Sequence, residues 1–75
     1  MSKKRTKALP GLHEGTIIRW GRVEGYGFIM CDEPGPQLFA HVEQIQYDSP
    51  RVGDRVRFVI IKDRSHYRAT RITRA

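Results

Sequence analysis

The sequence predicts a single small all-β domain, built as a five-stranded antiparallel β-barrel. Short runs rich in β-branched and aromatic residues alternate with turn residues from residue 15 onward. No window of three helical turns carries apolar residues at helical spacing. A sheet of five short strands would leave two exposed edges, and closing it into a barrel removes them. These observations favour a closed or partly open barrel.

The first two strands are predicted on either side of a glycine-bounded turn. Residues 16–20 (TIIRW) are β-branched and aromatic, which is typical of a strand. Residues 21–25 form the turn, and residues 26–31 form the second strand. Residues 32–36 (DEPGP) are the clearest turn in the chain, because two prolines around a glycine can continue neither a helix nor a ladder.

Three further strands complete the predicted barrel. Residues 37–42 form the third, which leads into a loop that ends near Gly53. Residues 54–61 alternate polar and apolar side chains at their start and form the fourth. After a polar turn, residues 67–73 form the fifth.

Length and cysteine content limit the class of protein. A chain of 75 residues makes one compact domain, and its single cysteine cannot form an internal disulfide. No apolar run approaches the length of a signal peptide core or a membrane span. The composition predicts a cytoplasmic monomer in a reducing setting, without a membrane or small-molecule cofactor as partner.

The formal net charge of +6 is unevenly distributed. Residues 1–13 are predicted to be a flexible basic arm, either a solubilising tail or a holder of phosphates, and residues 14–75 the folded domain. Residues 8–50 carry two arginines against six acids, and residues 51–75 carry eight basic residues against two acids. Because the aromatic strands lie in the acidic part, charge alone would not bring a nucleic acid to them.

Residues 25–29 (GYGFI) alternate glycine with two aromatic residues. Strand alternation places Tyr26 and Phe28 on one face and Ile29 on the other. The glycines are interpreted as sites where a flat ligand can lie close to both rings. This arrangement favours a platform on which bases stack, the alternative being that the aromatic residues form part of the core.

These motifs resemble those of the cold-shock domain, a bacterial type of OB-fold. The resemblance covers residues 14–73 and includes an apolar, basic, Trp run in the first strand. Its matching segments are residues 18–20, 25–29 (the first ribonucleoprotein motif), 38–42 (the second), Ile45 and residues 52–58. This chain departs from the family pattern at Glu24, Gly21 and Val42, where the family usually has a lysine and two aromatic residues.

The resemblance implies that surface aromatic residues stack successive bases of single-stranded RNA or DNA. The implied stacking residues are Trp20, Tyr26, Phe28, Phe39 and His41, with Arg19 near the backbone. Arg22 and Tyr47 are candidates to compensate for the departures, and Arg64 is predicted to contact phosphate. For Arg68, Arg71 and Arg74 a phosphate role and a solubilising role are both open.

Neither an enzyme nor a metal site is predicted. The possible metal ligands His13, His41, His66 and Cys31 are scattered without paired spacing. No nucleophile, base and orienting residue form a recognisable set, and no lysine and hydroxyl residue follow the glycines as in a phosphate loop. The predicted function is single-stranded nucleic-acid binding as an RNA chaperone or regulator of transcription or translation. The alternative is a small protein-interaction module that docks on a ribosome- or polymerase-associated partner.

Overall fold

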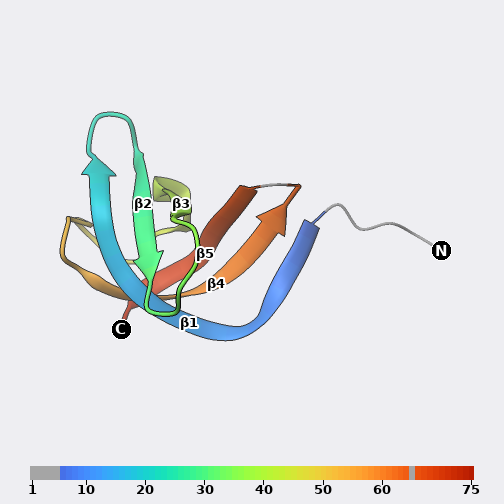
Figure 1. Ribbon diagram of the computed structural model, residues 1–75. Coiled ribbons are helices and arrows are strands. Elements are labelled where there is room, and N and C mark those ends of the chain that lie inside the picture. The colour runs from blue at the N-terminus through green and yellow to red at the C-terminus, as the bar shows by residue number, and fades with distance from the viewer. Residues whose placement is uncertain (1–5, 65) are drawn as a thin grey trace.

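A computed structural model describes residues 6–64 and 66–75 of the chain. Its elements are β1 (Thr6–Gly21), β2 (Tyr26–Cys31), β3 (Leu38–His41), the 3-10 helix η1 (Val42–Gln44), β4 (Arg55–Asp63) and β5 (His66–Arg74). The strands close into one barrel in the order β1-β2-β3-β5-β4, which confirms the predicted fold class (Figure 1).

Strand β1 is a long, curved strand that pairs with two neighbours (Figure 1). Its second half pairs antiparallel with β2, from Gly15 opposite Cys31 to Gly21 opposite Tyr26. Its first half pairs with β4, and the register shifts between Leu9 and His13, where the strand bends. Because β1 pairs with both β2 and β4, it closes one side of the barrel.

The start of β1 differs from the prediction. The strand begins at Thr6, so residues 6–13, which the sequence analysis assigned to a flexible arm, belong to β1, and residues 6–9 and His13 pair with β4. Backbone hydrogen bonds form this pairing and do not require an apolar pattern, so no strand was predicted from the side chains of these residues. The rest of the predicted arm, residues 1–5, lies outside the described residues.

The other side of the barrel closes between β3 and β5, which run parallel. Phe39 lies opposite Arg68 in this ladder, and an isolated parallel bridge joins Ile45 to Ile72. Because β3 is only four residues long, this contact is short. The chain then forms η1 where the prediction had a loop, and the backbone N–H of Ile45 closes its last turn on the carbonyl of Val42.

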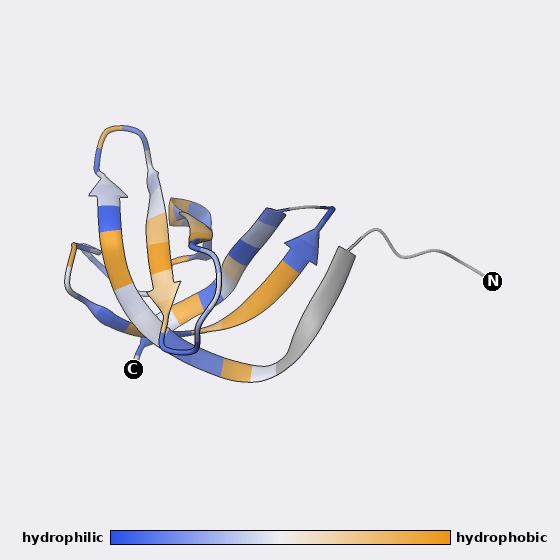
Figure 2. Cartoon of the chain, in the orientation of Figure 1, coloured by the Kyte–Doolittle hydropathy of each residue, from blue (hydrophilic) through white to orange (hydrophobic). Residues whose placement is uncertain are grey.

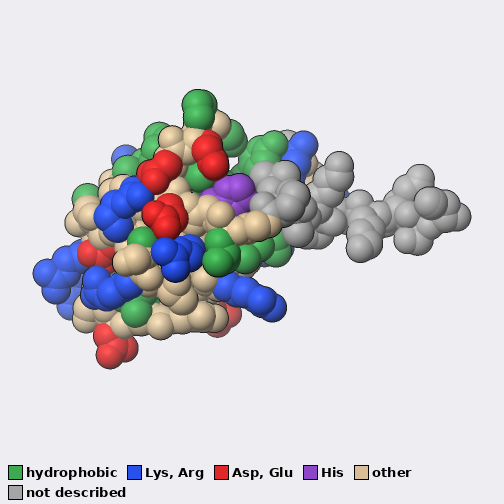
Figure 3. All heavy atoms as spheres, turned by 90° about the horizontal axis from the view of Figure 1, so that it is seen from below, with side chains coloured by type: hydrophobic (Ala, Val, Ile, Leu, Met, Phe, Trp, Pro, Cys, Tyr) green, Lys and Arg blue, Asp and Glu red, His purple; other side chains and the backbone are tan. Residues whose placement is uncertain are grey.

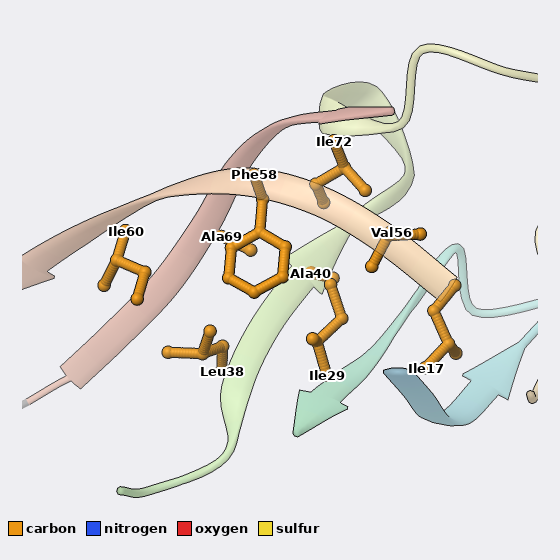
Figure 4. Packing of buried hydrophobic residues seen from close by; sticks show 9 residues of the cluster. All are labelled: Ile17, Ile29, Leu38, Ala40, Val56, Phe58, Ile60, Ala69 and Ile72. Atoms are coloured by element: carbon orange, nitrogen blue, oxygen red, sulfur yellow. The ribbon is translucent and has the colours of Figure 1, made fainter. Parts of the chain in front are cut away.

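Nine buried apolar side chains fill the barrel (Figure 4). They are Ile17, Ile29, Leu38, Ala40, Val56, Phe58, Ile60, Ala69 and Ile72. All five strands contribute, and Figure 4 shows the Phe58 ring extending among side chains from the strands around it. Buried and more exposed residues alternate along β2, β3 and the start of β4, because successive side chains point inward and outward. Figure 2 shows the apolar segments on β1, β2 and β4.

Truncation of this core gives a first test. Ile29→Val removes one methyl group from a fully buried side chain, so we expect the free energy of unfolding to fall by about 0.5–1.5 kcal/mol. The matched control is Ile18→Val in β1, where the side chain is exposed and we expect a change within about 0.5 kcal/mol. Urea denaturation measures both, and equal losses would contradict the assigned faces of the two strands.

Candidate nucleic-acid interface

Four aromatic side chains from β2 and β3 form one continuous cluster on the outside of the barrel, here called the aromatic cluster: Tyr26, Phe28, Phe39 and His41. Phe28 lies opposite Phe39 in the ladder, with ring centroids 5.9 Å apart, and Tyr26 lies 5.4 Å from Phe39. Phe39 is also 6.4 Å from His41. The rings of this cluster are partly exposed, and Tyr26 is 40% exposed. The structure therefore brings together four of the five predicted stacking residues.

The two glycines around Tyr26 have structural roles that differ from the interpretation made from the sequence. Gly27 is buried, and a Cβ there would clash with the carbonyl oxygen of Arg19 in β1. Its missing side chain thus admits the neighbouring strand, not a ligand. Gly25 has a φ of 82°, which favours glycine, and its N–H donates to the carbonyl of Gly21 to close the β1–β2 turn.

Trp20, the fifth predicted stacking residue, lies differently from the others. The register of β1 against β2 shifts between Ile17 and Arg19, so Arg19 lies opposite Phe28 and Trp20 lies opposite Gly27. Directly paired residues share a face, which places Arg19 with the aromatic cluster and turns Trp20 toward the barrel. The Trp20 side chain is half-buried and packs against the edge of the core.

Four hollows form a track along this surface, and Trp20 borders two of them. The first, of about 490 Å³, contains Trp20, Arg22 and Arg51 in its lining. The second, of about 300 Å³, adds Arg19 and Tyr26 and shares Trp20 with the first. The second hollow is also lined by Phe28 and by the acidic Glu24, so this part of the track combines three aromatic side chains with three arginines and one acid.

The track continues across β2, β3 and β5. The third hollow, of about 540 Å³, shares Phe28 with the second and contains Phe39, Tyr67 and Arg68 in its lining. The fourth, of about 200 Å³, shares Phe39 and Arg68 with the third and includes His41. Each pair of neighbouring hollows thus shares an aromatic side chain in its lining, and an exposed aromatic ring is a surface on which an unpaired base can stack.

Arg68 and Tyr67 are the main residues of this surface that the predicted site lacked. Arg68 is exposed, lies opposite Phe39 and borders two hollows. Its position depends on the parallel pairing of β3 with β5, which links residues far apart in sequence and leaves no local pattern. The Tyr67 ring is half-buried, with the Lys62 ammonium 5.5 Å from its centroid.

His41 has a fixed ring orientation at the end of β3. The backbone N–H of Glu43 donates to Nδ1 of His41 over 3.0 Å, which caps η1. An accepting Nδ1 carries no proton, so the neutral ring keeps its proton on Nε2. His41 lines the fourth hollow, and its Nε2–H, which has no hydrogen-bond partner among the residues that the structure describes, is a possible donor to a ligand there.

Tyr47 and Arg64, two further candidates from the sequence, are not among the lining residues of the four hollows, and their part in binding stays a prediction. The Tyr47 hydroxyl donates to Oδ2 of Asp54 over 2.8 Å, and the Arg74 guanidinium lies 4.5 Å from the ring centroid. Burial and this hydrogen bond raise the pKa of Tyr47 above its usual value. Arg64 is exposed in the β4–β5 turn with a φ of 60° and does not line any of the four hollows.

Arginines on another face of the barrel are engaged by acidic residues. Arg55 donates to both carboxylate oxygens of Asp32, over 2.8 and 2.7 Å, and Arg57 donates to Glu14 over 3.0 Å. The hydrogen bonds from Arg55 lower the pKa of Asp32. Acidic and basic side chains are interspersed on the face shown in Figure 3. Among the described residues, ion pairs of arginine with acidic side chains are found for Arg55 and Arg57 and not for the arginines that line the track.

A separate cluster joins Glu33 with His13 and Cys31, two of the four residues that the sequence analysis judged too scattered for a metal site. Oε1 of Glu33 lies 3.1 Å from Nδ1 of His13 and accepts a hydrogen bond from Sγ of Cys31 over 3.4 Å. Burial raises the pKa of the Cys31 thiol, and the hydrogen bond with His13 lowers the pKa of Glu33. The Nε2 atom of His13 is buried and has no hydrogen-bond partner among the described residues.

The fold and this surface define a small five-stranded barrel with an exposed row of aromatic and basic side chains. Over residues 13–75 the chain matches the family described as "'Cold-shock' DNA-binding domain". The chain belongs to the cold-shock domain family, a family of nucleic-acid-binding domains, which confirms the resemblance inferred from its motifs.

A solved structure supports the same assignment. The structure titled Drosophila Unr CSD456 is similar, with a TM-score of 0.74 and 30% sequence identity, and the match covers 87% of this chain. This chain corresponds to 27% of that protein's chain. No curated protein matches the sequence. Among the described residues, no helix has the length and apolar character needed to cross a membrane.

The Tyr47–Asp54 hydrogen bond predicts how stability depends on pH. Because the folded pKa of Tyr47 is raised, its stabilising contribution is complete below about pH 10 and is lost at higher pH, where only the unfolded chain releases the proton. We expect Tyr47→Phe to cost about 1 kcal/mol at neutral pH and to lose less stability than wild type above pH 10. Denaturation at several pH values measures this, and parallel pH profiles would contradict the structural role.

Proposed function

We propose that the protein binds unpaired RNA or DNA along the track of four hollows, without catalysing a reaction. The observation that supports this most directly is that neighbouring hollows share aromatic side chains in their linings, while arginines line each of them. Aromatic rings accept the flat face of any base, so sequence preference should be slight. A base pair in a duplex hides these faces, so duplex should bind weakly.

The energies are adequate for this function. Each stacked base contributes about 1–3 kcal/mol by truncation, so a few stacked bases reach the roughly 8 kcal/mol of a micromolar complex before association costs. Arg19, Arg22, Arg51 and Arg68 offer the phosphate contacts that add the rest. Binding should then weaken as salt rises, because each contact releases counterions.

This mode of binding suits an RNA chaperone or a regulator of transcription or translation, because holding unpaired bases opposes secondary structure. A cytoplasmic setting, a bacterial source and a monomeric state stay predictions of the sequence. The alternative, docking on a protein partner, predicts a complex that survives nuclease treatment.

Tryptophan fluorescence tests the proposed function. Because Trp20 borders two hollows, oligo-dT should quench its emission, and a duplex of equal length should bind much more weakly. We expect Phe39→Leu to weaken oligo-dT binding by about 5- to 150-fold, since leucine keeps the apolar contact but offers no ring for stacking. Tyr47→Phe is the control, because Tyr47 lies outside the track, and its oligo-dT affinity should match that of the wild type. Equal affinity for single strand and duplex would refute the proposal.

A second measurement tests the role of Arg68. We expect Arg68→Ala to lower oligonucleotide affinity and to reduce the slope of log affinity against log salt concentration by about 0.7, the share of one phosphate contact on a single strand. Arg57→Ala removes the same charge from an arginine that pairs with Glu14 on another face. If both variants change the slope equally, net charge and not position determines binding, and Arg68 is not part of the track.

A further inference from the structure

Three side chains able to bind a metal meet beside the end of β2. His13 comes from β1, Cys31 is the last residue of β2, and Glu33 lies in the turn that follows. One ligand atom from each lies within 4.8 Å of the other two. From this geometry we infer that His13, Cys31 and Glu33 form a binding site for a zinc ion, with a fourth coordination position open to water or another ligand.

The backbone holds the two parts of this site together. Cys31 lies opposite Gly15 in the β1–β2 ladder, and the N–H of Asp32 donates to the carbonyl of Glu14 over 2.9 Å. These contacts hold the end of β2 against β1 next to His13. The proximity of His13 to Cys31 and Glu33 therefore depends on the backbone of the barrel and not on flexible side chains alone.

The distances fit one tetrahedral ion. Zinc binds nitrogen and oxygen at about 2.0–2.2 Å and sulfur at about 2.3 Å, so ligand atoms around it lie roughly 3.3–3.7 Å apart. Glu33 Oε1 is 3.1 Å from His13 Nδ1 and 3.4 Å from Cys31 Sγ. The remaining pair, His13 with Cys31, lies within 4.8 Å and has to approach to about the same distance when the ion binds.

The donor atoms select the ion. One imidazole nitrogen, one thiol sulfur and one carboxylate oxygen suit zinc, whereas magnesium and calcium prefer oxygen alone. The His13 ring stacks on Phe58 with centroids 6.4 Å apart and planes at 22°, which holds its orientation. Because Nε2 is buried, Nδ1 is the nitrogen available to the ion. On binding, the thiol gives its proton to solvent and coordinates as thiolate, and His13 coordinates through an unprotonated Nδ1 with its ring proton moved to Nε2, so its hydrogen bond to Glu33 is replaced by the bonds of both groups to the ion.

A cobalt titration of the untagged 75-residue chain tests the site. Cobalt(II) substitutes for zinc and shows a charge-transfer absorption only when a thiolate coordinates it. We expect this band to saturate at one equivalent, to disappear when zinc is added, and to be absent in Cys31→Ser. Zinc should also raise the melting temperature, because it links β1 to the β2–β3 turn.

Glu33→Gln gives the decisive variant, because Glu33 is exposed in a turn and its replacement leaves the core intact. We expect cobalt affinity to fall by about tenfold or more. Asp48→Asn removes one negative charge from another exposed position and should leave affinity unchanged. The inference is overturned if wild type shows no thiolate band, or if Glu33→Gln and Asp48→Asn bind cobalt equally well.

Discussion

The pairing of β2 with β3 is the constraint on which the surface and the interior both depend. Phe28 lies opposite Phe39 and Ile29 lies opposite Leu38. The first pair points outward and joins the aromatic cluster, while the second is buried in the core. A slip of one residue in this ladder would exchange the two faces, exposing aliphatic side chains and burying the rings. The register that stabilises the barrel therefore also produces the candidate interface.

Much of this arrangement was predictable because local signals agree. The predicted second strand, residues 26–31, matches β2, since a positive-φ glycine precedes it and a proline-rich turn follows. Alternation within β2 and β3 correctly grouped Tyr26 with Phe28 and Phe39 with His41. The repeated turn residues and the absence of helical periodicity likewise indicated the all-β class.

The remaining features depend on pairings between distant segments, which local patterns do not record. The register shift after Ile17 reverses alternation, so Trp20 turns toward the barrel and Arg19 joins the outer row. Arg68 reaches the track through the parallel β3–β5 ladder. His13 and Glu33 meet because β1 passes the end of β2. In each case the sequence contained the right residue types, and only the closed barrel determined which of them became neighbours.

The β3–β5 contact has a consequence of its own. This parallel pairing of two strands is short: it consists of one ladder pair, Phe39 with Arg68, and a separate bridge from Ile45 to Ile72. We expect local opening of the barrel to begin at this short contact. A single-stranded nucleic acid that stacks on Phe39 and contacts Arg68 would link β3 to β5 from outside the barrel. Binding of nucleic acid would then stabilise the closed barrel, and the closed barrel would in turn favour binding.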